Sequence, residues 1–311
     1  MSLSVSINQI KRILPEAFLN KLYKIYDEHT INKILQGINT EKKTTCRINR
    51  LKSDFKEVSE YLKNFNIKFE RVIWYKDALI LGSNEKTIEK TDIYKEGKIY
   101  LQSLSSMIPP LVLEPKENEK ILDLAAAPGS KTTQISSITN NTGLITAYEL
   151  NKIRYEKLLY NINLQGCTNI KPILDNGEKA GEIYENYFDK AIIDAPCSGE
   201  GKFRIKNPKT FKAWSEKLVK NSVKIQKKLL SSAIKAVKEN GVIVYSTCTL
   251  NREENEDIIN WALENFNVKL DNININNFNL PTLPTIKGCL KIFQSQVSEG
   301  FFVSRIIKVK S

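Results

Sequence analysis

The chain has 311 residues, which suggests two domains, and its formal net charge of +12 predicts an acidic partner. A single histidine, His29, argues against a Ser–His–Asp mechanism and against a histidine-ligated metal. Five cysteines without a C-x-x-C pair argue against a disulfide framework and a zinc site, so we expect no metal. No stretch approaches the ~20 apolar residues of a membrane span, and the start lacks the apolar core of a secretory signal. We therefore expect a cytoplasmic protein with free thiols and no membrane partner.

Residues 1–98 have the pattern of a smaller α+β unit. Its expected elements are helices over 15–26 and 30–38, a strand over 44–51, a helix over 54–64, and strands over 68–75 and 78–82. Lys76 and Asp77 form the expected turn between the last two strands, and the polar stretch 92–97 is the expected linker to the second unit.

Residues 99–311 alternate short strands with helices, which predicts a doubly wound parallel sheet of the α/β class. The expected strands are 120–124, 143–149, 170–175, 190–194 and 241–247, and the expected helices are 131–139, 152–165, 208–240 and 253–266. An Asn-rich surface loop over 271–280 and two antiparallel strands, 289–293 and 301–309, complete the prediction.

The positive charge is concentrated near the start of the long helix expected over 208–240. Residues 202–238 contain 12 basic side chains and one acidic side chain, Glu216. Lysines 220, 224, 227 and 228 fall mainly on the solvent side of this amphipathic helix, where they either solvate it or contact an acidic partner. Lys202, Arg204 and Lys206 precede the helix in a loop and are the better candidates for contact with a polyanion.

Residues 121–132 predict a strand, a tight turn of small residues and the start of a helix. Ala125 and Ser130 stand where a Walker loop needs glycine, and Gly129 alone cannot make a dinucleotide fingerprint. This turn is therefore not suited to a pyrophosphate. The small side chains of Ala125, Ala126 and Ala127 let a ligand approach the backbone, and the following helix N-terminus favours a carboxylate.

Acidic residues end the next two predicted strands. Glu149, 20 residues after Gly129, is placed to hold the two hydroxyls of a ribose, and Asp175 could meet an adenine edge. S-adenosylmethionine has a carboxylate, a ribose and an adenine but no phosphate, so the pattern predicts it as the ligand.

Two cysteines follow the next two strands, Cys197 after Asp194-Ala195-Pro196 and Cys248 after Ser246-Thr247. Ligands of doubly wound sheets lie beyond the carboxyl ends of the strands, so both thiols are expected to face the ligand. A thiol beside a methyl donor suits the methylation of cytosine carbon-5, because a thiolate that adds to carbon-6 makes carbon-5 nucleophilic. Asp194 is placed to accept a hydrogen bond from the cytosine amine.

Residues 123–132, 194–201 and 246–256 resemble the signature blocks of the Sun / nucleolar-antigen (RsmB/NOP) family of RNA cytosine-5 methyltransferases. The resemblance spans residues 99–308 and implies a Rossmann-like class I methyltransferase domain. It implies that Cys248 is the nucleophile and that Cys197 assists product release. It also implies roles in cofactor or base contact for a set of further residues: Lys131, Asp194, Glu149, Arg154 and Asp175, beside the turn that contains Pro128.

Three residues depart from the family pattern: Ala125 replaces the usual cysteine, Ser130 the usual glycine, and Glu149 the commoner aspartate. Residues 47–52 (Arg-Ile-Asn-Arg-Leu-Lys) resemble a strand of the family's RNA-recognition-like N-terminal domain. The resemblance implies an rRNA or tRNA partner, and residues 202–208 are more similar to the ribosomal branch.

Several alternatives stay open on the sequence alone. They are a methyltransferase for a protein or a small molecule, and a non-catalytic RNA-binding protein of the same fold. The base that removes the carbon-5 proton is also open between Cys197, Asp194 and water.

Overall fold

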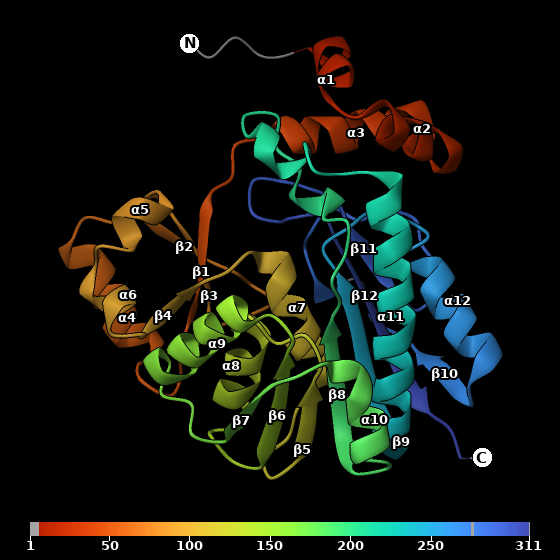
Figure 1. Ribbon diagram of the computed structural model, residues 1–311. Coiled ribbons are helices and arrows are strands. Elements are labelled where there is room, and N and C mark those ends of the chain that lie inside the picture. Colours follow the sequence, from red (N-terminus) through yellow and green to blue (C-terminus); the bar gives the residue numbers. More distant parts are fainter. Residues whose placement is uncertain (1–5, 275–276, 311) are drawn as a thin grey trace.

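The computed structural model describes residues 6–274 and 277–310, and two separate β-sheets organise them (Figure 1). The eight-stranded sheet has the order β10-β12-β9-β8-β5-β6-β7, and β11 pairs with β12 outside this path. Its strands are β5 (Lys120–Asp123), β6 (Leu144–Glu149), β7 (Ile170–Leu174), β8 (Phe188–Asp194), β9 (Val237–Thr247), β10 (Val268–Asp271), β11 (Leu290–Ile292) and β12 (Phe301–Lys308).

Five consecutive strands of this sheet, from β9 through β8, β5 and β6 to β7, run parallel, and β12 pairs antiparallel with β9. The chain leaves β5 for β6 on one side and reaches β8 on the other, so the strand order switches beside β5. Ligands of doubly wound sheets bind at such a switch point, beyond the carboxyl ends of the strands. The fold therefore places the ends of β5, β6, β8 and β9 around one cleft.

Helices cover both faces of the large sheet, as the sequence alternation of strands and helices predicts. One face packs against α11 and α12 through Leu122, Ile193 and Tyr245, and the other packs against α7 and α8 through Ile121 and Ile192. Successive strand residues thus enter opposite cores, which is the reason these strands are apolar throughout. The helices of this unit are α7 (Leu104–Leu113), α8 (Ser130–Ile138), α9 (Lys152–Leu164), α10 (Ala180–Ile183), α11 (Glu216–Ala236) and α12 (Glu256–Asn265).

The second sheet is small and antiparallel, with the order β2-β3-β1-β4. Its strands are β1 (Thr44–Ile48), β2 (Phe69–Arg71), β3 (Ala78–Leu81) and β4 (Ile99–Leu101), and its helices are α4 (Phe55–Asn64), α5 (Glu85–Ile88) and α6 (Asp92–Lys95). Cys46 and Leu79 from the strands and Val58 and Leu62 from α4 share one core. The expected α+β unit is therefore present, next to the doubly wound unit.

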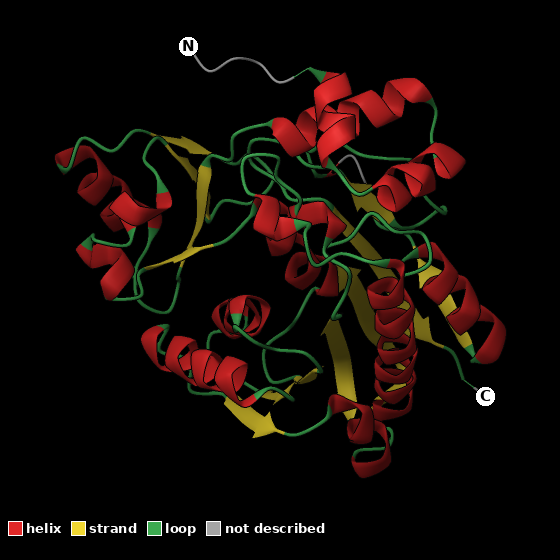
Figure 2. Cartoon of the chain, turned by 45° about the horizontal axis from the view of Figure 1, so that its top comes forward, coloured by secondary structure: helices red, strands yellow, loops and turns green. Residues whose placement is uncertain are grey.

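The structure differs from the expected division at residue 98. Strand β4 begins at Ile99 and pairs with β1, so it completes the small sheet. Helices α1 (Ile7–Ile13), α2 (Glu16–Ile25) and α3 (Glu28–Asn39) lie apart from that sheet, at the top of Figure 1 and in the upper right of Figure 2. They pack on the doubly wound unit instead, where the ring centroid of Phe18 lies 5.0 Å from that of Phe203.

Several expected elements differ in extent. The long helix α11 begins at Glu216, because residues 208–210 form a separate 3₁₀ turn. It ends at Ala236, and β9 begins at the next residue, Val237. The expected linker 92–97 contains α6, whose C-cap residue Glu96 donates its backbone N–H to the carbonyls of Asp92 and Tyr94. Ile273 is buried against the sheet, so residues 271–280 are not simply a surface loop, and residues 275 and 276 lie outside the described part. No helix of the described residues is both long and apolar enough to cross a bilayer.

Candidate active site

The turn after β5 has the compact geometry that its small residues predict. Gly129 adopts a φ of +104°, and a Cβ there would lie 3.1 Å from Leu158. Glycine is therefore required at this position, whereas Ser130 is an ordinary first residue of α8. The side chain of Thr132 donates a hydrogen bond to Asp123 at 2.7 Å and ties the helix start to the strand end. The turn thus presents the N-terminus of α8 toward the cleft.

Glu149 ends β6 with its carboxylate buried beside this turn. Its Oε1 accepts a hydrogen bond from the backbone N–H of Asn151 at 2.9 Å, and Oε2 lies 3.7 Å from Arg154 without a hydrogen-bond partner among the described atoms. Arg154 also donates to the carbonyl of Ala127 in the turn. A buried carboxylate oxygen without a hydrogen-bond donor is suited to accept a hydrogen bond from a hydroxyl group of a bound ligand.

Asp175 follows β7 and is much more exposed than Glu149. It is half exposed and forms an ion pair with Lys179 at 2.8 Å. The hydrogen bond from Lys179 lowers the pKa of this carboxyl, and the backbone N–H of Asn176 adds to the effect. The expected adenine contact would therefore have to share Asp175 with Lys179.

Lys131 and Asp194 form the charged centre of the cleft. Nζ of the buried Lys131 lies 2.7 Å from Oδ2 of Asp194, and it also donates to Ser106 at 2.9 Å. The second carboxylate oxygen of Asp194 accepts a hydrogen bond from Ser246 at 3.0 Å. The strand register places Asp194 opposite Ser246, so β8 and β9 hold this carboxylate between them.

Cys197 and Cys248 meet at the ends of the same two strands. Their Sγ atoms lie 3.2 Å apart, and both side chains are partly exposed to the cleft. The other three cysteines, Cys46, Cys167 and Cys289, are buried elsewhere. All five thiols are free, so this pair is a dithiol rather than a disulfide.

The two thiols differ in acidity. The hydrogen bond from Cys197 lowers the pKa of Cys248, and the positive charge of Lys202 acts in the same direction. The same contact, together with burial, raises the pKa of Cys197 well above its usual range. The negative charge of Cys248 in turn raises the pKa of Lys202. Cys248 is therefore the more acidic thiol of the pair, and Cys197 the less acidic one.

Glu254 holds the loop that carries Cys197. Its carboxylate accepts hydrogen bonds from the backbone N–H of Ser198 at 2.8 Å and from Gln226 at 3.1 Å, and the hydroxyl of Ser198 adds a third. Burial raises the pKa of Glu254 to about 7. Ser198, the residue after Cys197, is thus held in place by Glu254, which lies in the segment that follows Cys248.

The three basic residues of the loop before α11 differ in exposure and in their contacts. Lys202 is exposed and close enough to Cys248 to shift its pKa. Arg204 is half buried and donates to the carbonyls of Gly37 and Ser298, and Lys206 pairs with Glu41 at 3.2 Å. Arg204 therefore links α3 and the C-terminal segment to this loop through hydrogen bonds, and its expected contact with a polyanion stays a prediction.

Sequence reasoning found the two cysteines, Lys131 and Asp194, but it missed Ser106, Ser246 and Glu254. Ser246 had a usable signal, because residues at the ends of neighbouring parallel strands lie side by side. Ser106 and Glu254 are distant in sequence from their hydrogen-bond partners, so no local pattern predicts these contacts.

Comparisons with known proteins agree with this arrangement. A family model described as 16S rRNA methyltransferase RsmB/F matches residues 110–307, and the model of the ferredoxin-like domain of RsmF/B-like proteins matches residues 14–87. The first match covers more than half of the chain. The chain belongs to the RsmB/F methyltransferase family. The expected fold class, a Rossmann-like methyltransferase domain behind a smaller α+β domain, is confirmed.

Two relatives show how much of the chain the similarity covers. Ribosomal RNA small subunit methyltransferase F of Vibrio atlanticus is 35% identical over 96% of this chain, which spans 64% of that protein's length. A tRNA (cytosine(49)-C(5))-methyltransferase of Pyrococcus abyssi is 38% identical over 74% of both chains. Among solved structures, a methyltransferase homolog of Pyrococcus horikoshii superposes with a TM-score of 0.83 at 29% identity, covering 99% of this chain and all of that one.

Proposed function

We propose that this RsmB/F-family chain methylates carbon-5 of a cytosine in RNA, with S-adenosyl-L-methionine as the methyl donor. The observation that carries the proposal is the 3.2 Å contact between the sulfurs of Cys197 and Cys248, at the strand ends that also hold Asp194. A methyltransferase that acts on an ordinary nucleophile needs no thiol, and a protein that only binds RNA needs no thiolate.

The residues at the end of β5 and β6 fit the methyl donor. Glu149 offers a buried oxygen without a hydrogen-bond partner for a ribose hydroxyl, and the turn from Ala125 to Ser130 offers close backbone approach. The N-terminus of α8 favours the ligand's carboxylate. When bound, the donor supplies a methyl group on a positively charged sulfur.

The thiolate of Cys248 is the nucleophile. Its sulfur forms a bond to carbon-6 of the cytosine, and the electron pair of the 5,6 double bond moves into the ring and makes carbon-5 nucleophilic. Asp194 accepts a hydrogen bond from the exocyclic amine, and the ion pair with Lys131 orients that carboxylate. Uracil has a carbonyl oxygen in place of the amine, so the same contact selects cytosine.

Cys197 serves the second half of the reaction. After carbon-5 carries the methyl group, a base removes the carbon-5 proton, the 5,6 double bond re-forms, and the bond from carbon-6 to Cys248 breaks. Burial still raises the pKa of Cys197 when Cys248 is bonded to the ring, so its thiol is protonated at that stage, and it lies next to the departing sulfur. The proton acceptor is Asp194 or a water, or the thiolate of Cys197 once its own proton has passed to the departing sulfur.

The target base has to leave its stack to reach a thiol at the edge of the sheet. Ribosomal RNA is the preferred substrate of this proposal, because the ribosomal RNA small subunit methyltransferase F of Vibrio atlanticus matches 96% of the chain. Transfer RNA is the alternative, favoured by the higher identity to the archaeal enzyme over a shorter match. Both thiols must stay reduced, which fits the cytoplasm.

The test uses purified protein, methyl-labelled S-adenosyl-L-methionine and separately prepared ribosomal and transfer RNA. Label in 5-methylcytosine after digestion to nucleosides is the expected result, and the RNA that carries it decides between the two substrates. Label in another nucleoside, or tight RNA binding with no label in either RNA, would contradict the proposal.

A further inference from the structure

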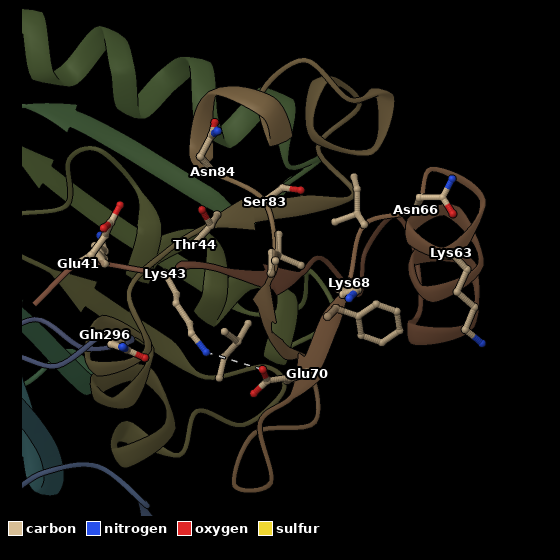
Figure 3. A pocket seen from close by; sticks show the side chains of 16 residues that line it. Glu41, Lys43, Thr44, Lys63, Asn66, Lys68, Glu70, Ser83, Asn84 and Gln296 are labelled. Atoms are coloured by element: carbon tan, nitrogen blue, oxygen red, sulfur yellow. Dashed lines mark ion pairs between the residues drawn. The ribbon is translucent and has the colours of Figure 1, made fainter. Parts of the chain in front are cut away.

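One face of the small sheet carries polar side chains in two very different surroundings. The register aligns Glu70, Ile80 and Thr45 across β2, β3 and β1, and the first two line a pocket of about 1120 Å³ (Figure 3). Arg47 lies two residues further along β1 and so shares this face. Its guanidinium is fully buried against the doubly wound unit, where Nη2 donates to Thr133 of α8 at 3.1 Å. The reaction proposed above gives this buried cation no role.

Gln102 connects Arg47 to the doubly wound unit. It follows β4 directly, is buried, and accepts a hydrogen bond at Oε1 from Nε of Arg47 at 3.3 Å. A guanidinium can only donate hydrogen bonds, so the oxygen of the Gln102 amide faces Arg47 and its NH₂ group faces the other way. That NH₂ group donates to the carbonyl of Ser106 at 3.0 Å and to Oε1 of Gln134 at 3.2 Å. Arg47 thus determines the direction in which the Gln102 amide points.

The carbonyl of Ser106 accepts this hydrogen bond because a proline stands in α7. In a helix a carbonyl accepts from the backbone N–H four residues later, and for Ser106 that residue is Pro110, which has no N–H. A carbonyl that is left without a donor in the interior costs free energy, so a replacement donor stabilises the fold. Gln102 supplies that donor and thereby holds the backbone of Ser106 in one position.

The hydroxyl of Ser106 completes the connection to the active site. Its Oγ accepts a hydrogen bond from Nζ of Lys131 at 2.9 Å, and the same ammonium group lies 2.7 Å from Asp194. An ammonium group on a flexible four-carbon chain stays in one place only when fixed acceptors hold it. Asp194 also has to accept the cytosine amine during the reaction, so Ser106 is the acceptor whose contacts the substrate does not change.

We infer that Gln102 is a positioning residue of the reaction, which acts on Lys131 through Ser106. Arg47 orients the Gln102 amide, so the small sheet takes part in the chemistry through a buried contact that is separate from any contact with RNA. Without this series of hydrogen bonds the ammonium group of Lys131 moves away from Asp194. The carboxylate then loses its orientation toward the cytosine amine, and addition of the thiolate to the ring slows. The inference rests on the function proposed above.

The experiment compares Gln102→Leu and Ser106→Ala, which break the series, with Ser106→Thr, which keeps the hydroxyl. The matched control is Ser137→Ala, which removes another hydrogen bond between the two units, the one from the backbone N–H of Arg50 at 3.1 Å. Single-turnover methyl transfer is measured on the RNA that accepts label in the test above, together with the Kd values of RNA and methyl donor. Acetylation of Lys131 by N-acetoxysuccinimide, followed by peptide mass spectrometry, gives a readout that needs no methyl transfer. Urea unfolding shows whether each variant folds.

We expect Gln102→Leu and Ser106→Ala to slow single-turnover transfer roughly ten-fold, as the loss of one hydrogen bond to a charged group predicts. The Kd of RNA should stay at the wild-type value, because no residue of the series is exposed to the RNA surface. Ser106→Thr should recover most of the rate, and Ser137→Ala should keep all of it. Lys131 should be acetylated several times faster in the two variants that break the series, and at the wild-type rate in the control.

Three results would overturn the inference. They are an equal loss of rate in Ser137→Ala, weaker RNA binding with an unchanged rate, and a folded Gln102→Leu protein with wild-type transfer and acetylation. If Gln102→Leu does not fold, the contrast between Ser106→Ala and Ser106→Thr gives the same test. A wild-type protein that transfers no methyl group, while acetylation of Lys131 changes as expected in the variants, would refute the proposed reaction and keep the positioning of Lys131.

Discussion

The Sγ atoms of Cys197 and Cys248 lie 3.2 Å apart although 51 residues separate them in the chain. Their strands, β8 and β9, are parallel neighbours, and the register pairs Asp194, three residues before Cys197, with Ser246, two residues before Cys248. The contact makes the pair asymmetric, with Cys248 as the stronger acid. The first predictions follow from this asymmetry.

Replacing each cysteine separately should give opposite results. Cys248→Ser removes the nucleophile, so methyl transfer to RNA should fall below detection with no covalent complex. Cys197→Ser keeps the nucleophile but loses the thiol beside the departing sulfur, so a protein–RNA adduct resistant to detergent should accumulate. Denaturing gels with labelled RNA check both, and Cys289→Ser, a buried cysteine away from the cleft, is the control. An adduct with Cys248→Ser would reverse the two roles.

Mild oxidation should inactivate the protein reversibly. Diamide takes two electrons from two adjacent thiols, and only Cys197 and Cys248 among the described cysteines are in contact. We expect a loss of two titratable thiols under denaturing conditions, a peptide map that links these two residues, and recovery of methyl transfer with dithiothreitol. A linkage that involves Cys46, Cys167 or Cys289 would refute this prediction.

The pH dependence of methyl transfer should depend on Lys202. Because the thiolate reacts, the rate should rise with pH through the pKa of Cys248, which lies below that of an ordinary thiol. Lys202→Met removes a cation that favours the thiolate, so the rise should move to higher pH. Lys206→Met, in the same loop but paired with Glu41, is the control and should leave the profile in place. An unchanged profile for Lys202→Met would show that its charge does not act on Cys248.

Glu149 and Asp175 should contribute unequally to binding of the methyl donor. Glu149→Gln replaces the buried oxygen that lacks a partner with a group of weaker acceptor strength, so the Kd of S-adenosyl-L-methionine should rise about ten-fold or more. Asp175→Asn alters a half-exposed carboxylate already paired with Lys179, so the rise should stay below about three-fold. Isothermal titration measures the Kd for both variants, and a larger rise for Asp175→Asn than for Glu149→Gln would contradict this prediction.

Glu254 should make stability depend on pH. Its folded pKa of about 7 lies above the ~4.3 of an unfolded glutamate, so the folded state holds the proton more tightly. The free energy of unfolding should therefore fall as pH rises from about 4.3 to 7. Glu254→Gln cannot titrate and should flatten this dependence relative to the wild type. Asp123, with a pKa also near 7, contributes in the same direction in both proteins.

Urea unfolding at pH 5 and pH 8 gives the comparison between the wild type and Glu254→Gln. Glu254→Ala should also lower the free energy of unfolding by roughly 2–3 kcal/mol at pH 7, because Ser198 and Gln226 lose their acceptor. Equal pH slopes for the wild type and the Gln variant would show that Glu254 stays ionised in the folded protein.

The local order of strands, turns and helices could be predicted from the sequence, because hydrophobic periodicity and turn residues act over short stretches of chain. This determined the doubly wound class, the turn at Gly129 and the placement of Cys197 and Cys248 at strand ends. The same reasoning misjudged α11, since its amphipathic pattern continues past Ala236 into β9 and no glycine or proline marks the change.

Only the tertiary structure decided which residues meet. The 3.2 Å sulfur contact depends on β8 and β9 being neighbours in register, and the fixing of Ser198 by Glu254 depends on two loops that no local pattern connects. Helices α1–α3 pack on the doubly wound unit because apolar surface is buried between segments that are distant in the chain. The hydrogen bonds of Arg204 to Gly37 and Ser298 likewise join distant segments. Sequence periodicity specifies which face of an element is buried, whereas its partner is specified by packing across the whole chain.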